Sequence, residues 1–235
     1  MARTETIARD RVHGFIAHAD KAIGGVLVLP TITGVDPAMR TLAQELAGAG
    51  MTALVWDPFP GDAPPPTEHP ALMARANTLN DDLAEANMSA CIDHMLGPLR
   101  LSSVAVLGFC LGGRYSLLLA AHDKRLAACV AFYPSVRVPM KPNETRDAVA
   151  LAPQIVCPVQ LVQAGGDQVI VFPTFLKLRE ALETRKAATI AQLHPGAVHS
   201  FRRGDFQSDP ANAAATRISW PPALAFLQDR LRAAA

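Results

Sequence analysis

The sequence has little charge, few aromatic residues and no long apolar segment. Only 18% of its 235 residues are charged, with a net charge of +1, and 6% are aromatic. This composition gives no indication of a nucleic-acid partner or an anionic membrane. No apolar run reaches the roughly 18 residues that a membrane-spanning helix needs. The first six residues lack the apolar centre of a signal peptide. We therefore expect no membrane association and a cytoplasmic location.

Disulfide and metal motifs are also missing. Cys91, Cys129 and Cys157 lie in apolar surroundings, without C-x-x-C or C-x-H spacing. We interpret these three as buried packing residues, as is usual for free cysteines. His194 and His199 have no carboxylate or cysteine beside them at ligand spacing, so we expect no metal. The absence of paired cysteine spacing agrees with a reducing cytoplasm.

What the chain does contain is apolar sequence arranged in alternating strand-like and helical segments. Half of its residues are hydrophobic, and its length suits one large α/β domain or two small ones. Alternation of this kind predicts a mainly parallel central sheet with helices on both faces. We expect a single domain over residues 1–235, with its ligand site at the carboxyl ends of the strands. We find no internal repeat.

Local patterns place the individual elements. We expect the segment 12–17 to form a first strand that pairs with 25–29, and Asp36 to cap a helix that runs to about residue 47. Six prolines within residues 58–70 predict a loop, which we place on the rim of the active site. Further strands are expected at 52–56, 104–107, 126–133, 159–164 and 188–193, and further helices at 71–96 with a break near Asn80, behind Cys110, at 172–184 and at 221–231. On the helical stretch 71–96 we expect a solvated face formed by Asp81, Asp82 and Glu85.

The segment Gly108-Phe109-Cys110-Leu111-Gly112 has the pattern of a nucleophile elbow with sulfur in place of oxygen. It joins an apolar strand to a helix, and its two glycines remove β-carbons that would collide in so sharp a turn. The N-terminus of the following helix favours a thiolate, and the Leu111 N–H would lie where an oxyanion forms. This pattern alone is equally compatible with a Gly-rich turn around a structural cysteine.

Partners for a cysteine nucleophile follow later in the chain. A nucleophile needs a base, and the base needs an orienting acid. Asp167 follows the expected strand 159–164, and His199 lies in the loop after the strand 188–193. The order nucleophile, acid, histidine is that of α/β-hydrolases. Asp57 also ends a strand, but its place before Cys110 favours a structural role.

Together, the elbow G-F-C-L-G-G, the G-G-D that follows a strand and the loop G-x-x-H-S-F resemble the dienelactone hydrolase family of α/β-hydrolases, over roughly residues 12–230. The resemblance implies Cys110 as the nucleophile, His199 as the base and Asp167 as the acid that orients it. It also implies the Ile32 N–H as a second oxyanion donor beside that of Leu111. It further implies a monomeric hydrolase of small-molecule esters or lactones, some of them carboxylate-bearing, that needs no cofactor.

Two positions bear on the substrate. Family members with the named activity carry a glutamate where this chain has Thr31, so the resemblance makes Thr31 a substrate-site residue that cannot accept a proton at neutral pH. It also implies Arg203 as a carboxylate-binding residue, a role that suits the planar guanidinium. The alternative for Arg203 is a solvated loop charge. Arg75 is the one candidate for a second carboxylate-binding arginine, on a loose alignment.

Three functions are compatible with these residues. The first is an ester or lactone hydrolase of dienelactone type that acts through a thioester on Cys110. The second is a carboxylesterase or thioesterase with another substrate, which the Thr31 departure favours. The third is a non-catalytic binding protein on the hydrolase fold, because fold alone does not fix function.

Overall fold

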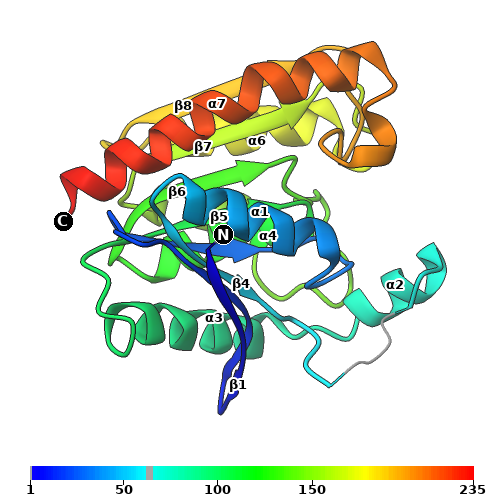
Figure 1. Ribbon diagram of the computed structural model, residues 1–235. Helices are drawn as coiled ribbons and strands as arrows, with labels where there is room; N and C mark the ends of the chain where they lie inside the picture. The colour runs from blue at the N-terminus through cyan, green and yellow to red at the C-terminus, as the bar shows by residue number, and fades with distance from the viewer. Residues whose placement is uncertain (1, 62–65) are drawn as a thin grey trace.

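In the computed structural model, which describes residues 2–61 and 66–235, the strands form one sheet (Figure 1). Its order is β1-β2-β4-β3-β5-β6-β7-β8. The pairs β1–β2 and β2–β4 are antiparallel, and all the other neighbouring pairs are parallel. The strands are β1 (Arg3–Arg9), β2 (Val12–His18), β3 (Gly25–Leu29), β4 (Thr52–Trp56), β5 (Val104–Phe109), β6 (Leu126–Phe132), β7 (Val159–Ala164) and β8 (Thr189–His194). The mainly parallel sheet predicted from the sequence is confirmed.

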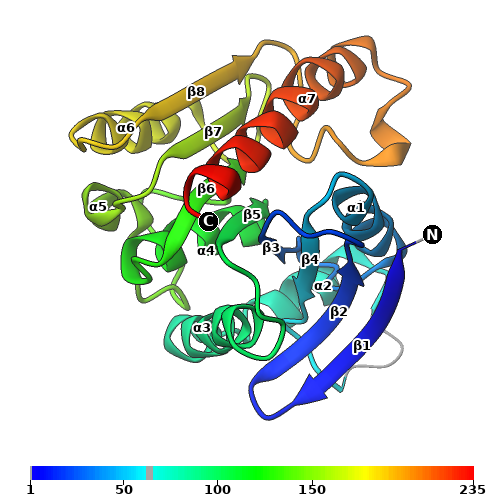
Figure 2. The same cartoon turned by 60° about the vertical axis from the view of Figure 1, so that its left-hand side comes forward.

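Helices cover both faces of this sheet (Figure 2). One face carries α1 and α7, and the other carries α3, α4, α5 and α6. The helices are α1 (Pro37–Gly48), α2 (His69–Ala76), α3 (Asp81–Leu96), α4 (Leu111–His122), α5 (Ala148–Leu151), α6 (Phe172–Glu183) and α7 (Pro210–Ala233). As expected, Asp36 caps α1, and the break near Asn80 separates α2 from α3.

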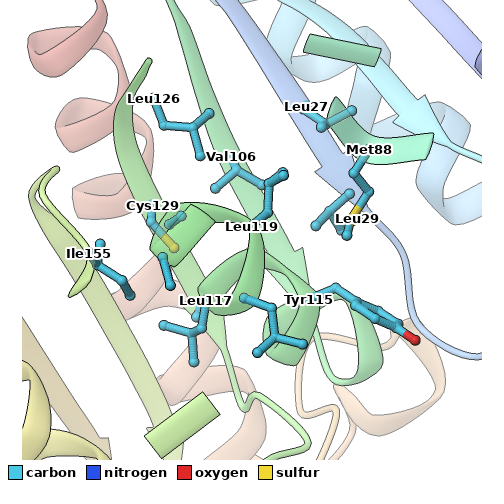
Figure 3. Packing of buried hydrophobic residues seen from close by; sticks show 14 of the residues in the cluster. Leu27, Leu29, Met88, Val106, Tyr115, Leu117, Leu119, Leu126, Cys129 and Ile155 are labelled. Atoms are coloured by element: carbon cyan, nitrogen blue, oxygen red, sulfur yellow. The ribbon is translucent and has the colours of Figure 1, made fainter. Parts of the chain in front are cut away.

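The alternation of side chains along each strand builds two cores. On β3, Leu27 and Leu29 pack toward α3 and α4, whereas Val26 and Val28 pack toward α1 and α7. Figure 3 shows the first of these cores, where side chains of α4 lie against those of the central strands. Cys129 belongs to this core, and Cys91 and Cys157 are buried in it too, as predicted. The two cores fix the position of β5, which carries the elbow.

The expected pairing of the first strand was wrong. Strand β2 pairs with β4 and with β1, a preceding strand that we did not predict, and it does not pair with β3. Strand β1 is polar and largely exposed along its length, so it lacks the apolar alternation that identifies a strand in a sequence. Strand β3 instead lies between β4 and β5, in parallel with both.

The expected solvated face of α3 was also wrong in part. Asp82 is exposed, but Asp81 is 2% exposed and Glu85 is buried. Both buried carboxylates have cationic partners far along the chain: Arg114 for Asp81 and Arg146 for Glu85. Ion pairing explains how these charges are buried.

The last helix begins eleven residues before the position expected. Helix α7 starts at Pro210, where the side chain of Asp209 accepts hydrogen bonds from two backbone N–H groups, and it includes Pro221 and Pro222 in its interior. On the part that was predicted, residues 221–231, Leu227 and Leu231 are fully buried.

Two expectations concern the surface of the molecule. In the described part of the chain, no helix is both long and apolar enough to cross a membrane. Residues 62–65 of the Pro-rich stretch, which we predicted to be a loop on the rim of the site, lie outside the described residues. The last residues of that stretch begin α2, whose His69 and Leu72 line the cavity described below.

Candidate active site

Cys110 lies in a sharp turn between β5 and α4. Its backbone has φ 53° and ψ −112°, a conformation that non-glycine residues rarely adopt. Its N–H donates to Phe132 at 3.0 Å, and its carbonyl accepts from the Ser135 N–H at 2.8 Å. A β-carbon on Gly108 would lie 2.0 Å from the Gly112 carbonyl oxygen, which explains why the sequence needs glycine before the cysteine. Cys110 therefore caps the N-terminus of α4, as the elbow pattern predicted.

Asp167 and His199 are brought together from the loops after β7 and β8. The Nδ1 atom of His199 lies 2.8 Å from Asp167 Oδ2. The other oxygen of Asp167 accepts from the N–H groups of Val169 at 2.8 Å and Ile170 at 2.9 Å. These bonds hold the carboxylate in place, and the carboxylate in turn fixes the orientation of the imidazole.

The second nitrogen of His199 is buried and has no hydrogen-bond partner among the described residues. Burial opposes the charged imidazolium, but the hydrogen bond to Asp167 and the interaction with the Cys110 side chain raise the pKa of His199 to about 9. The imidazole of His199 thus binds a proton more strongly than a free histidine does, and the Cys110 side chain contributes to this effect.

The two expected oxyanion donors lie on adjoining segments. The Gly112 N–H, next to Leu111, donates to the Pro30 carbonyl at 3.0 Å and so joins the start of α4 to the loop that carries Ile32. Arg75 fixes the same loop from outside, since its Nη2 donates to the carbonyl oxygens of Ile32 at 3.0 Å and Thr33 at 3.3 Å.

A cavity of about 850 Å³ opens over these groups. Volumes of this order accommodate a small-molecule ligand. All the predicted site residues except Asp167 line this cavity: Thr31, Ile32, Cys110, Leu111, His199 and Arg203. Asp167 contacts His199 and is not part of the lining. Asp57 instead accepts from the Phe59 N–H at 2.9 Å in its own turn, as expected for a structural carboxylate.

The two consecutive arginines differ in their surroundings. The side chain of Arg203 is 58% exposed, and its guanidinium makes two hydrogen bonds to Asp205, at 3.0 and 2.6 Å. Arg202 instead stacks over the ring of Trp220, with its guanidinium carbon 3.6 Å from the ring centroid. Burial lowers the pKa of Arg202. The prediction of a substrate contact thus falls on the more exposed of the two side chains.

Thr31 takes part in a short chain of hydroxyl groups. Its Oγ1 lies 2.8 Å from the Thr33 Oγ1, which donates to Asp36 Oδ2 at 2.7 Å. The same carboxylate group caps α1. Thr31 is therefore linked to a helix cap at the position where the resemblance places a glutamate.

Two features of the cavity were missed in the sequence. Tyr133 follows β6 at φ 36°, and its ring lies edge-on to His199 with centroids 5.4 Å apart. Arg114, one turn into α4, makes two hydrogen bonds to Asp81, at 2.8 and 2.7 Å. A signal existed for the arginine, because it is the only charged residue between Leu111 and Ala121.

Metal ligation was not expected. Across residues 2–61 and 66–235, no group of three or more His, Cys, Asp or Glu side chains is arranged to hold a metal ion.

Comparison with known proteins connects this geometry to a family. The model of the dienelactone hydrolase family matches residues 12–231. A carboxymethylenebutenolidase of Rhodococcus opacus is 31% identical over 235 residues, covering 96% of this chain and 89% of that protein. A dienelactone hydrolase from Anabaena variabilis has a similar structure, with a TM-score of 0.65 at 19% identity over 91% of this chain and 95% of that one. A dienelactone hydrolase-like promiscuous phosphotriesterase from metagenomic libraries superimposes with a TM-score of 0.79 at 20% identity, covering 97% and 99% of the two chains.

Proposed function

The chain belongs to the dienelactone hydrolase family, and we propose that it hydrolyses an ester or lactone through a Cys110–His199–Asp167 triad and a thioester intermediate. The R. opacus relative is named for lactone hydrolysis. One observation carries the proposal: Asp167 Oδ2 lies 2.8 Å from His199 Nδ1, so the other nitrogen, the buried Nε2, is available to accept the proton of Cys110.

In the first half of the reaction, His199 Nε2 accepts the proton of the Cys110 thiol. The sulfur attacks the carbonyl carbon of the substrate, and the carbonyl electron pair moves to oxygen. The N–H groups of Leu111 and Ile32 stabilise that oxyanion. When the carbonyl reforms, the bond to the alkoxide or enolate oxygen breaks, and His199 returns the proton to the leaving group.

In the second half, a thioester on Cys110 is hydrolysed. His199 takes a proton from water, the hydroxide oxygen attacks the thioester carbonyl, and the C–S bond breaks. The acid is released and the sulfur regains its proton. Asp167 keeps the imidazole in the tautomer that presents Nε2 throughout. No cofactor enters either half.

Thr31 favours a second candidate, a carboxylesterase or thioesterase with another substrate. Its hydroxyl interacts with Thr33 and supplies no carboxylate beside the thiol. In such an enzyme, generation of the thiolate depends on His199 alone.

Steady-state hydrolysis of a neutral activated ester and of an enol lactone tests the proposal. Cys110→Ala should keep the fold and lose both activities by at least about 10⁴-fold, because the nucleophile is removed. Circular dichroism serves as the control for folding. Turnover that persists in folded Cys110→Ala contradicts the triad, and activity on the ester alone favours the second candidate.

A further inference from the structure

Segment 134–147, between β6 and α5, forms one wall of the cavity and carries two cations there. Arg137 and Lys141 both line the cavity. Within the described residues neither side chain forms an ion pair. The Arg137 guanidinium donates to the Ser135 carbonyl at 3.4 Å, and the Lys141 ammonium donates to Asn77 Oδ1 at 3.4 Å. Both bonds are long, so neither strongly compensates a positive charge.

The carboxylates that line the same cavity are engaged with other groups. Their partners include a hydroxyl, an indole N–H and two arginines: Asp36 with Thr33, Glu45 with Trp220, Asp81 with Arg114 and Asp205 with Arg203. Glu144 accepts from the Lys141 backbone N–H at 3.1 Å and lies 3.8 Å from Arg114. Glu144 thus contacts one backbone N–H and one arginine, so on segment 134–147 the cavity is lined by two cations, Arg137 and Lys141, and a single carboxylate.

The two cations also act on one another. Burial and the neighbouring Arg137 guanidinium lower the pKa of Lys141, while Glu144 and Cys110 oppose this shift. Like charges held together beside a partly buried cavity destabilise the empty site, and an anion placed between them removes that cost. The Ser135 N–H donates to the Cys110 carbonyl at 2.8 Å, so this wall adjoins the turn that carries the sulfur.

This wall is separate from the loop that carries Arg203. Val136 packs in the core on the α3 and α4 face of the sheet, whereas Phe201 packs in the core on the α1 and α7 face. Cys110 directly follows β5 and packs against the second of these cores. A substrate whose carbonyl contacts Cys110 therefore meets two groups of cavity-lining cations, one on segment 134–147 and one on the loop of Arg203.

We propose that Arg137 and Lys141 form an anion-binding subsite, and that the preferred ester or lactone carries an anionic group on the part that lies against segment 134–147. The inference rests on the proposed hydrolase function and specifies its substrate class. Arginine offers a planar pair of donors and lysine a mobile point charge, a combination that binds a carboxylate.

Matched pairs of esters test the subsite in the intact protein. For the acyl side, para-nitrophenyl hemiglutarate is compared with para-nitrophenyl butyrate. For the leaving-group side, para-carboxyphenyl acetate is compared with phenyl acetate. We expect kcat/KM to be higher for the anionic member of at least one pair, and the pair that shows this preference identifies the side bound by the subsite.

The variants are Arg137→Met and Lys141→Met, with Arg179→Gln as the matched control. Arg179 lies on α6 and pairs with Glu183, so its replacement removes the same charge away from the cavity. In each cavity variant the ratio of anionic to neutral kcat/KM should fall by about tenfold, because a close charge interaction is lost. Arg179→Gln should leave the ratio unchanged. Equal ratios in the parent and in both cavity variants overturn the subsite.

A binding measurement separates this inference from the proposed function. Titration calorimetry with glutarate on Cys110→Ala needs no turnover. We expect binding that weakens about tenfold when Lys141→Met is added. Glutarate binding that does not respond to Lys141→Met or Arg137→Met, or no binding, overturns the subsite whether or not esters are hydrolysed. Absence of ester turnover beside intact glutarate binding instead contradicts the hydrolase proposal.

Discussion

Two buried carboxylates, Asp81 and Asp167, each hold a basic partner, yet the two pairs differ in which atoms they leave without a partner. Asp81 uses both oxygens on Arg114 and also accepts from the N–H groups of Thr145 and Arg146. Asp167 holds His199, a residue that can lose its proton, and the second nitrogen of that ring has no partner among the described residues.

The difference separates a structural pair from a reactive one. Arginine stays charged at all relevant pH values, so the Asp81–Arg114 pair can only fix α3, α4 and the chain near Thr145. A histidine with one engaged and one available nitrogen can move a proton. Burial, which both pairs share, does not distinguish them. The two pairs differ because His199, unlike Arg114, can lose its proton, and because Nε2 of His199 has no hydrogen-bond partner among the described residues.

The largest expected effect is on the reactive pair. Asp167→Asn should lower kcat by about 10³- to 10⁴-fold, because the amide does not stabilise the imidazolium or its productive tautomer. The melting temperature should change little in comparison. Ester hydrolysis and thermal unfolding measured on one preparation check both statements. A variant that unfolds rather than loses turnover would make Asp167 structural.

The structural pair should show the reverse. Asp81→Asn leaves the buried Arg114 without its counter-charge and should destabilise the fold by about 3–5 kcal/mol. The double variant Asp81→Leu with Arg114→Met removes both charges and should recover much of that loss. Urea unfolding measures all three proteins. If Asp81→Asn were as stable as the parent, the Asp81–Arg114 pair would not stabilise the fold.

Low pH should reduce the contribution of the Asp81–Arg114 pair to the free energy of unfolding. Burial opposes ionisation of Asp81, but Arg114 and the backbone N–H groups of Thr145 and Arg146 lower its pKa to about 2. Because the folded pKa lies below the unfolded one, the stabilisation is present above about pH 4 and is lost as the pH falls through 2. It amounts to about 2 kcal/mol. The unfolding free energy of the parent, compared with the double variant between pH 2 and 6, should show this difference.

High pH should reduce the contribution of the other pair, Asp167 and His199, to the free energy of unfolding. The pKa of His199 is raised to about 9, so its contribution to stability is complete below the unfolded value near 6.5 and is lost as the pH rises through 9. His199→Gln should remove this dependence. Unfolding curves of the parent and the variant should converge above pH 9, and a parent that gains stability over that range would contradict the assigned direction.

The smallest effect is expected at Arg203. Its ion pair with Asp205 is largely exposed, so Arg203→Ala should change the unfolding free energy by less than about 1 kcal/mol. If Arg203 binds a substrate carboxylate, the same variant weakens acidic esters selectively. Equal losses on neutral esters would make the side chain structural.

The sequence supplied most of the elements and the order of the site residues, because both depend on local patterns. Apolar runs identified the parallel strands, and the glycines around Cys110 identified the elbow. The same local signal was overlooked at the end of the chain. Asp209-Pro210 starts α7 just as Asp36-Pro37 starts α1, but Pro221 and Pro222 suggested a later start.

Other features depend on partners that local patterns do not reveal. Asp81 has the appearance of a solvated helix residue until Arg114, 33 residues away, is placed beside it. The pairing of β2 with β4 depends on where β3 lies in the sheet, which no property of residues 12–17 determines. The position of Arg137 and Lys141 in the same cavity as Cys110 becomes visible only when the fold brings these segments together.

The most direct measurement is the rate at which iodoacetamide alkylates each cysteine, followed by peptide mass spectrometry beside ester hydrolysis. Burial raises the pKa of Cys91 to about 12 and that of Cys157 to about 11, so both should label slowly. Cys110 should label far faster at pH 7, with a parallel loss of hydrolysis, and His199→Gln should slow that labelling. Full alkylation of Cys110 with hydrolysis intact, or equal labelling rates at Cys110 in the parent and in His199→Gln, would contradict the proposed nucleophile and its base.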